Sequence, residues 1–368
     1  MYMPHAEKLL FTPGPLTTSV SVKQAMLKDM GSRDESFIRL VSEIRDGILK
    51  LAGVAREDGY EAVPIQGSGT FGIEALFATV IGPKDRLLIL VNGAYGQRMV
   101  EIARCHGLVH EVYEVPENAI HEQSTVDSML AGSRFTHLAG VHCETTTGIL
   151  NPIDHWGAVA KTHRCHFIVD AMSSFGGIPL DMTANHIDFL VASSNKCLQG
   201  VPGVAFVVAN RESLMSGQNE PRSVSLNLRQ QLLGFERNGQ FRFTPPTHVL
   251  LALHQALMEL DAEGGVQCRA ARYSVNNQLL CAGMCELGFR AYLPKTLQSH
   301  IITAFLYPER NFSFEEFYRR LSDRGMLIYP GKLSKVDCFR IGNIGHLFPE
   351  DINELLVAIK TVLSEMKS

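Results

Sequence analysis

An aspartate and a lysine each follow an apolar segment in the middle of the chain. Asp170 ends the segment HFIVD (166–170), and Lys196 follows DFLVASSN (188–195). Ligands of open α/β sheets bind beyond the carboxyl ends of buried strands. A lysine at such a position can act as a nucleophile with a lowered pKa. Taken singly, Asp170 could cap the next element, and Lys196 could extend into solvent.

A glycine-rich loop precedes both residues. The segment Gly67-Ser-Gly-Thr-Phe-Gly72 spells GxGxxG between an expected strand and an expected helix. Glycines let the backbone approach a ligand closely, and a helix N-terminus offers free N–H groups to an anion. Ser68 and Thr70 add hydroxyl donors, so we predict a cup for a phosphorylated cofactor. A tight turn without a ligand is the alternative.

A nicotinamide-dependent dehydrogenase would also use such a glycine loop. Two features disfavour that interpretation. The loop lies far from the start of the chain, and the next expected strand ends in Asn92, where an acid should hold the ribose.

The lysine, the acid and the anion cup together match the needs of pyridoxal phosphate. The acid keeps the ring nitrogen protonated, and the lysine can move a proton between substrate and cofactor. Asp170 and Lys196 lie 26 residues apart, which is enough for one helix-length crossover and one strand between them.

Short apolar runs alternate with amphipathic stretches from residue 61 onward. Strands are expected at 61–66, 86–91, 110–115, 136–143, 166–171, 188–194 and 203–209, and helices at 70–81, 94–105, 122–132 and 155–164. Continuous apolar runs indicate strands that are covered on both faces. Strand–helix alternation indicates a mostly parallel sheet. The predicted fold class is therefore α/β, with helices on both faces of the sheet.

The last third of the chain has a different pattern. Helices are expected at 246–262, 266–287, 313–323 and 349–366, and strands at 299–307, 326–330 and 338–343. We predict a large cofactor-binding domain over residues 15–263. A smaller α+β domain would consist of residues 264–368 together with 1–14.

The composition excludes several classes of protein. A chain of 368 residues that is 45% hydrophobic can build a large core, and its net charge of −4 does not suit sequence-independent binding to nucleic acid. No apolar run is long enough to cross a membrane, and no signal peptide is recognisable. Eight scattered cysteines indicate a reducing, cytoplasmic location. We expect no metal. The only tight histidine pair, His163 and His166, straddles the end of an expected helix, where histidines more often cap the helix or face solvent.

Several ordered motifs together resemble the class V (fold type I) pyridoxal-phosphate aminotransferases. They are Thr12-Pro-Gly-Pro15, Gly67-Ser-Gly-Thr70, Asn92-Gly-Ala-Tyr-Gly-Gln-Arg98, Glu144-Thr-Thr-Thr-Gly148, Val169-Asp170, Ser193-Ser-Asn-Lys196 and Phe339-Arg-Ile-Gly342. The resemblance extends over nearly the whole chain. It implies a transaminase with pyridoxal phosphate as cofactor.

The resemblance also implies a role for each matched residue. Lys196 would bind the cofactor covalently, Asp170 would pair with the ring nitrogen, and Arg340 would bind a substrate carboxylate. Further cofactor contacts would come from Ser68, Gly69, Thr70, Tyr95, Thr145, Ser193 and Asn195. Thr244 matches a residue that reaches the phosphate of the neighbouring subunit, which implies a homodimer.

A narrower resemblance concerns the substrates. The segments 12–19, 193–207 and 242–257 resemble class V members that use 2-aminoethylphosphonate and pyruvate. The phosphonate would use Arg340 as well, together with extra donors, for which Arg33, Arg45 and Arg242 are candidates because they lie near matched segments. An alanine/serine–glyoxylate or serine–pyruvate aminotransferase remains the alternative.

Two other classes stay open. A desulfurase or lyase needs a reactive cysteine on a mobile loop, and neither Cys197 nor Cys338 lies in such a segment. A non-enzymatic binding module would bind the cofactor without turning it over.

Overall fold

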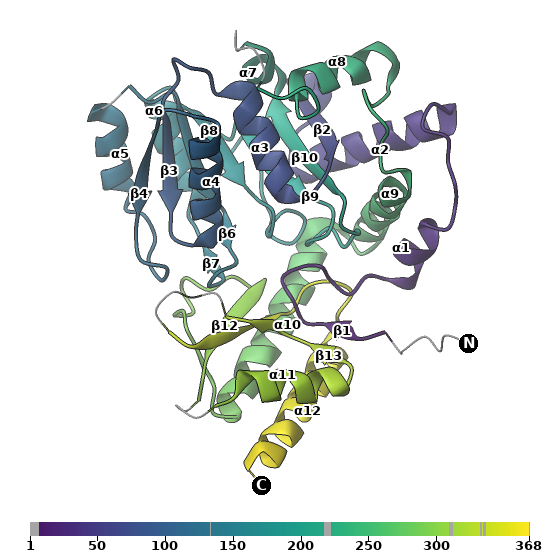
Figure 1. The fold of residues 1–368 in the computed structure, drawn as a ribbon, viewed down its shortest axis with the longest axis vertical. Coiled ribbons are helices and arrows are strands. Elements are labelled where there is room, and N and C mark those ends of the chain that lie inside the picture. The colour runs from purple at the N-terminus through teal and green to yellow at the C-terminus, as the bar shows by residue number, and fades with distance from the viewer. Residues whose placement is uncertain are drawn as a thin grey trace.

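The computed structural model describes residues 7–367, apart from 133, 217–221, 309–311, 332 and 334–335. A seven-stranded sheet with its helices forms the larger part, and a smaller part lies below it (Figure 1). The strands of the large sheet stand in the order β2 (Tyr60–Gln66), β10 (Val204–Asn210), β9 (Phe189–Ser193), β8 (His166–Asp170), β5 (His137–Val141), β3 (Leu87–Val91) and β4 (His110–Glu114).

Six of these seven strands point the same way. Strands β9, β8, β5, β3 and β4 pair in parallel, whereas β10 is antiparallel to both of its neighbours, β9 and β2. The mostly parallel sheet is confirmed, but the reversed β10 was not predicted. Its cause is the short connection 194–203, since a parallel crossover needs a dozen residues or more.

Helices cover the sheet on both faces. Every residue of β3, β5 and β9 is buried, which requires cover on each side. Helix α3 (Gly69–Val80) packs against β9 and β10, α4 (Ala94–Cys105) against β3, and α6 (Ile153–Thr162) against β5 and β8. The predicted α/β class is therefore confirmed. Helices α5 (Gln123–Gly132) and α9 (Thr247–Ala262) complete the elements predicted for this part.

Four helices of the large part were not predicted. They are α1 (Val20–Ala25), α2 (Glu35–Leu51), α7 (Arg211–Ser216) and α8 (Leu228–Asn238). Of these, α2 has a clear signal. Its buried residues Leu40, Val41, Ile44 and Ile48 have helical spacing, and the Asp34 side chain caps its first turn.

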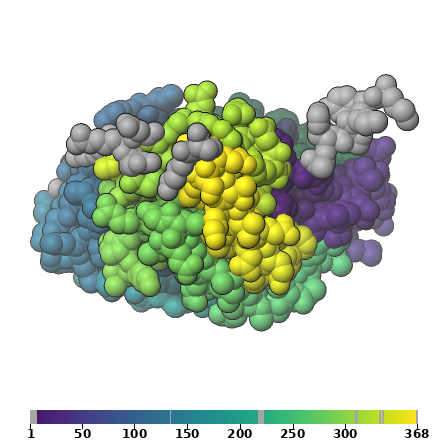
Figure 2. Space-filling model, turned by 90° about the horizontal axis from the view of Figure 1, so that it is seen from below, coloured from purple at the N-terminus to yellow at the C-terminus, as the bar shows by residue number. Residues whose placement is uncertain are grey.

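The smaller part has its own sheet and core. The strands stand in the order β11 (Arg290–Ala291), β12 (Ile302–Leu306), β15 (Cys338–Gly342) and β14 (Tyr329–Pro330), and all pairs are antiparallel. Helices α10 (Gly265–Glu286), α11 (Phe314–Asp323) and α12 (Pro349–Lys367) pack around it. Seen from below, the yellow α12 lies across the outer face (Figure 2).

The N-terminal segment joins this smaller part. Strand β1 (Leu9–Leu10) pairs in parallel with β13 (Met326–Leu327), and Phe11 is fully buried in the core of the smaller part. The predicted boundary near residue 264 falls between α9 and α10. A further apolar cluster, which contains Cys197 and Tyr273, lies where the two parts meet. None of the helices within the described ranges has the length and apolar character needed to cross a membrane.

Candidate active site

The predicted site residues converge at one edge of the large sheet. Asp170 ends β8, Ser193 ends β9, and Ser68 follows β2, so these side chains share the carboxyl edge of strands that point the same way. A cavity of about 220 Å³ opens there. Its walls include eight predicted residues, namely Ser68, Gly69, Thr70, Tyr95, Asp170, Ser193, Asn195 and Lys196.

The glycine loop forms the start of α3. Ser68 is the N-cap residue, but its hydroxyl accepts no hydrogen bond from the first turn. The N–H groups of that turn therefore remain available to an anion. A Cβ at Gly69 would come within 2.3 Å of Met172 Sδ, so a larger residue there would displace the Met172 side chain beside the cavity. Because β2 is an antiparallel edge strand, the loop does not begin the parallel unit of a dinucleotide fold.

Asp170 is a buried carboxyl that forms no ion pair with any of the described residues. Its Oδ1 accepts a hydrogen bond from Met172 N at 2.9 Å. Burial raises the pKa of Asp170 to about 7; the Met172 N–H lowers it, nearby Glu144 raises it, and Lys196 and Arg98 lower it. A cationic group beside this carboxyl would favour its charged form. The protonated ring nitrogen of pyridoxal phosphate is such a group.

Lys196 is enclosed by the N-terminal loop. Its Nζ donates to Pro13 O at 2.7 Å. Gly14 has a φ of +123°, and a Cβ there would lie 2.8 Å from the lysine Nζ, so the loop can close over Lys196 only with glycine at this position. Burial lowers the pKa of Lys196, which increases the fraction of neutral, nucleophilic amine.

A buried glutamate, Glu144, positions Tyr95 at the start of α4. Its carboxylate accepts hydrogen bonds from Tyr95 N at 3.1 Å and from Gly96 N at 3.2 Å. The same carboxylate accepts from Thr146 N at 3.0 Å and from Thr146 Oγ1 at 2.6 Å. Burial raises the pKa of Glu144, and these four hydrogen bonds lower it. No role was predicted for Glu144, although it begins one of the matched motifs.

Thr145 and Arg340 contact each other but do not line this cavity, although Arg340 lies near Tyr95 and Lys196, which do. Arg340 is on β15 of the smaller part, and its Nη1 donates to Thr145 O at 2.8 Å. Its Nε donates to Pro330 O at 3.1 Å, and burial lowers its pKa. Thr145 Oγ1 is buried and has no hydrogen-bond partner in the described structure. A ligand oxygen next to Thr145 would satisfy it.

Three observations thus fit pyridoxal phosphate. The uncapped N-terminus of α3 suits the phosphate, the carboxyl of Asp170 suits the ring nitrogen, and the unpaired hydroxyl of Thr145 suits the phenolic oxygen of the ring. Lys196 lines the same cavity as the first two. The residues present can therefore hold this cofactor.

The structure does not bring every predicted residue to this cavity. Thr145, Thr244 and Arg340 do not line it, and Thr244 is exposed in the single chain. Arg45, a phosphonate candidate, is buried, and its charge is already paired, since its Nη2 lies 2.5 Å from Glu61 Oε2. Arg33 is exposed, and Arg242 donates to Val224 O at 2.9 Å. None of the three arginines lines the cavity.

Sequence reasoning missed other residues of the cavity wall. They are Ile73, Arg98, Met99, Ile102, Met172 and Ser173. For Arg98 a signal existed: it follows Tyr95 by three residues in an expected helix, and residues with this spacing share a face.

The cysteines and histidines weighed for other chemistries have structural roles. Cys197 Sγ donates to Ser173 O at 3.1 Å, and burial raises the pKa of its thiol, which disfavours a reactive thiolate. Cys338 is buried on β15. His163 Nε2 lies 2.8 Å from Asp127 Oδ1, and the described residues contain no cluster suited to a metal ion.

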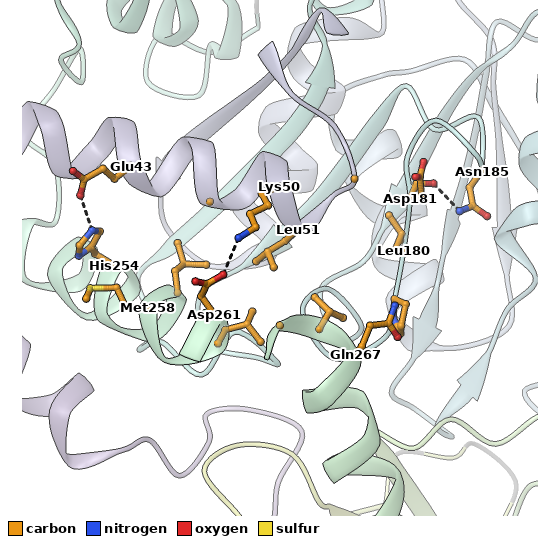
Figure 3. Close-up of a pocket in the computed structure, with 17 residues that line it drawn as sticks. Glu43, Lys50, Leu51, Leu180, Asp181, Asn185, His254, Met258, Asp261 and Gln267 are labelled. Atoms are coloured by element: carbon orange, nitrogen blue, oxygen red, sulfur yellow. Dashed lines mark hydrogen bonds and ion pairs between the residues drawn. The ribbon is translucent and has the colours of Figure 1, made fainter. Parts of the chain in front are cut away.

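A larger cavity, of about 710 Å³, lies between α2, α9 and the start of α10 (Figure 3). Four of its polar side chains form two separate pairs. Lys50 Nζ lies 2.8 Å from Asp261 Oδ1, and His254 Nε2 lies 2.8 Å from Glu43 Oε2. No predicted site residue lines this cavity.

Comparison with known proteins identifies the family. The model of the class-V aminotransferase family matches residues 19–332. A 2-aminoethylphosphonate–pyruvate transaminase of Salmonella heidelberg (strain SL476) is 50% identical over 363 residues, which are 98% of each chain. One of Phocaeicola vulgatus is 49% identical and covers 96% of this chain and 98% of its own.

A solved structure, ureidoglycine–glyoxylate aminotransferase of Bacillus subtilis, superposes with a TM-score of 0.92 at 24% identity, and covers 100% of this chain and 96% of its own. That likeness establishes the shared fold. The family match and the two relatives establish more, since they extend over most of the sequence. The chain belongs to the class-V aminotransferase family.

Proposed function

We propose that this chain is a pyridoxal-phosphate transaminase that moves the amino group of 2-aminoethylphosphonate to pyruvate, which gives phosphonoacetaldehyde and L-alanine. The observation that carries the chemistry is the placement of Lys196 and Asp170 in one cavity with the uncapped N-terminus of α3. The choice of substrates is supported by relatives that are half identical over nearly the full length and bear that name.

The cofactor, when bound, supplies an electron sink for the carbon from which a proton is removed. Asp170 would hold the ring nitrogen in its protonated form. The cup of Ser68, Gly69 and Thr70 would bind the phosphate, and Thr145 would donate to the ring oxygen. Lys196 Nζ would take the proton from the substrate carbon and return it, since burial favours its neutral form.

Arg340 would bind the carboxylate of pyruvate and alanine. Its guanidinium can form two parallel hydrogen bonds to a carboxylate. It extends from the smaller part to Thr145 of the larger part, so the proposed substrate site lies between the two parts. We assign residues 15–263 to the cofactor-binding domain, and 264–368 with 1–14 to the smaller domain.

We propose a homodimer in the cytoplasm. Phe71, beside the cup, and Phe243, beside Thr244, are 51% and 53% exposed in the single chain. A second copy that covers them would bring its Thr244 to the phosphate. The eight cysteines all lie within the described residues and form no disulfide, which suits a reducing compartment. Light scattering tests the dimer: a monomer that keeps active cofactor would contradict the role of Thr244.

A donor–acceptor matrix tests the reaction. The enzyme is saturated with pyridoxal phosphate and given 2-aminoethylphosphonate, alanine or serine as amino donor, with pyruvate or glyoxylate as acceptor. We expect the highest kcat/KM for 2-aminoethylphosphonate with pyruvate. Preference for alanine or serine with glyoxylate, or for serine with pyruvate, would overturn the substrates and leave the cofactor site intact.

A further inference from the structure

Arg98 is a charged side chain of the cavity wall that has no assigned role in binding the cofactor or the substrates. Arg98 lies on α4, three residues after Tyr95, and is half-buried. It lines the same cavity as the cup residues Ser68, Gly69 and Thr70. Apart from Lys196, it is the one cationic side chain among the residues that line this cavity.

The contacts of Arg98 compensate its charge only in part, since Asp170 lies near enough for Arg98 to lower its pKa but forms no ion pair with it. Its Nη1 donates to Thr70 Oγ1 at 3.2 Å, and its guanidinium carbon lies 5.0 Å from the centre of the Tyr95 ring. No carboxylate of the described residues forms an ion pair with it. A half-buried cation usually has an anionic partner, because removing it from water is costly. An aromatic face offsets only part of that cost.

The phosphate cup carries no full positive charge, although a phosphate with two negative charges would require one. Ser68 and Thr70 contribute hydroxyls, and α3 contributes the partial charge of its N-terminus, which amounts to about half an elementary charge. An oxygen bound by Thr70 Oγ1 lies within roughly two hydrogen-bond lengths, about 6 Å, of Arg98 Nη1.

We propose that Arg98 binds the phosphate group of the cofactor together with Thr70 and supplies the positive charge that the cup lacks. This inference rests on the proposed function. The same guanidinium chemistry would also suit the phosphonate of the substrate. The cofactor phosphate is favoured because the hydrogen bond of Arg98 is to the cup, whereas the carboxylate-binding candidate, Arg340, contacts Thr145.

Two cofactor forms separate a phosphate contact from a general effect. Cofactor-free enzyme is titrated with pyridoxal phosphate and with pyridoxal, which lacks the phosphate, and Kd is measured from cofactor absorbance. Loss of a charge-assisted hydrogen bond weakens binding by roughly 10- to 100-fold. We expect Arg98→Gln to raise Kd for pyridoxal phosphate by about that factor and to change Kd for pyridoxal less than about threefold.

Two further variants control the experiment. Arg104→Gln removes the same charge from an exposed position of the same helix and should leave both Kd values unchanged. Arg98→Lys keeps the charge and should recover part of the loss. If Arg98→Gln fails to fold, the comparison of Arg98→Lys with wild type still decides, since a lysine lacks the guanidinium fork and should lose affinity for the phosphorylated form alone.

The possible results are distinct. Equal weakening for both cofactor forms, or weakening for neither, would overturn the role of Arg98. Arg98→Gln could instead leave the ratio of the Kd values for pyridoxal phosphate and pyridoxal unchanged and raise KM for 2-aminoethylphosphonate. That result would also overturn the proposal and would assign Arg98 to the substrate. If the wild-type protein binds no pyridoxal phosphate, both this inference and the proposed function fail. If the wild-type protein binds it tightly and the Arg98 variants do not behave as expected, only the role of Arg98 fails.

Discussion

Replacing Asp170 by asparagine should change how the stability of the cofactor-free enzyme depends on pH. Burial raises the pKa of Asp170 to about 7, whereas an unfolded chain has about 3.9. Between these values the native state keeps the proton and the unfolded state has lost it. The native state therefore binds more protons, and its stability falls as pH rises from about 4 to about 7.

The magnitude follows from the size of that shift. The slope is about 1.4 kcal/mol per pH unit while the two states differ by one proton. Between pH 5 and pH 7, with Asp170 half-ionised at the upper end, the free energy of unfolding should fall by roughly 2 kcal/mol. An asparagine side chain cannot titrate, so this part of the pH dependence should disappear in Asp170→Asn.

Urea unfolding of both cofactor-free proteins at pH 5 and pH 7 measures the effect, at one protomer concentration because assembly affects stability. Glu144 is present in both wild type and Asp170→Asn. The difference between the two proteins in the pH dependence of the unfolding free energy therefore reports Asp170 and its interaction with Glu144. Saturating pyridoxal phosphate should flatten the wild-type dependence, because a protonated ring nitrogen favours the charged carboxylate. The same fall in both cofactor-free proteins would refute the assignment of a buried, unpaired carboxyl.

Three further substitutions test other parts of the account. Lys196→Ala should abolish turnover while circular dichroism stays unchanged, and retained turnover would contradict its role. Arg340→Ala should lower kcat/KM for pyruvate by about 100-fold, with cofactor content close to normal; near-normal turnover would remove Arg340 from the site. Arg45→Met should lower the free energy of unfolding by about 3 kcal/mol, because buried Glu61 then keeps only the longer contact to Arg56 Nε, at 3.5 Å. Adding Glu61→Leu should recover most of that loss, and an additive loss in urea unfolding would contradict the buried pair.

The strands of the large sheet could be predicted because their apolar runs are continuous. Strands β3 and β9 are covered on both faces, and such strands have few polar positions. The same signal placed Asp170 and Lys196, since each follows a run that ends at the carboxyl edge of the sheet. The amphipathic spacing of α2 was equally informative, although no helix was predicted there.

Other features depend on contacts that no local pattern encodes. An apolar run such as β10 looks the same in either direction, and only the length of its connection to β9 indicates that it is antiparallel. The contact of Lys196 with Pro13 joins residues 183 positions apart. Arg45 looks like a free cation in the sequence, but the fold places Glu61 beside it.

The absorption spectrum of the purified enzyme tests the cofactor site and the amino donor in one experiment. We expect a visible band from the cofactor bound to Lys196 after saturation with pyridoxal phosphate. The band should disappear when 2-aminoethylphosphonate is added and return when pyruvate follows. A band that responds only to alanine or another amino acid would contradict the substrate, and no band after saturation would contradict the cofactor site formed by Asp170, Lys196 and the glycine loop.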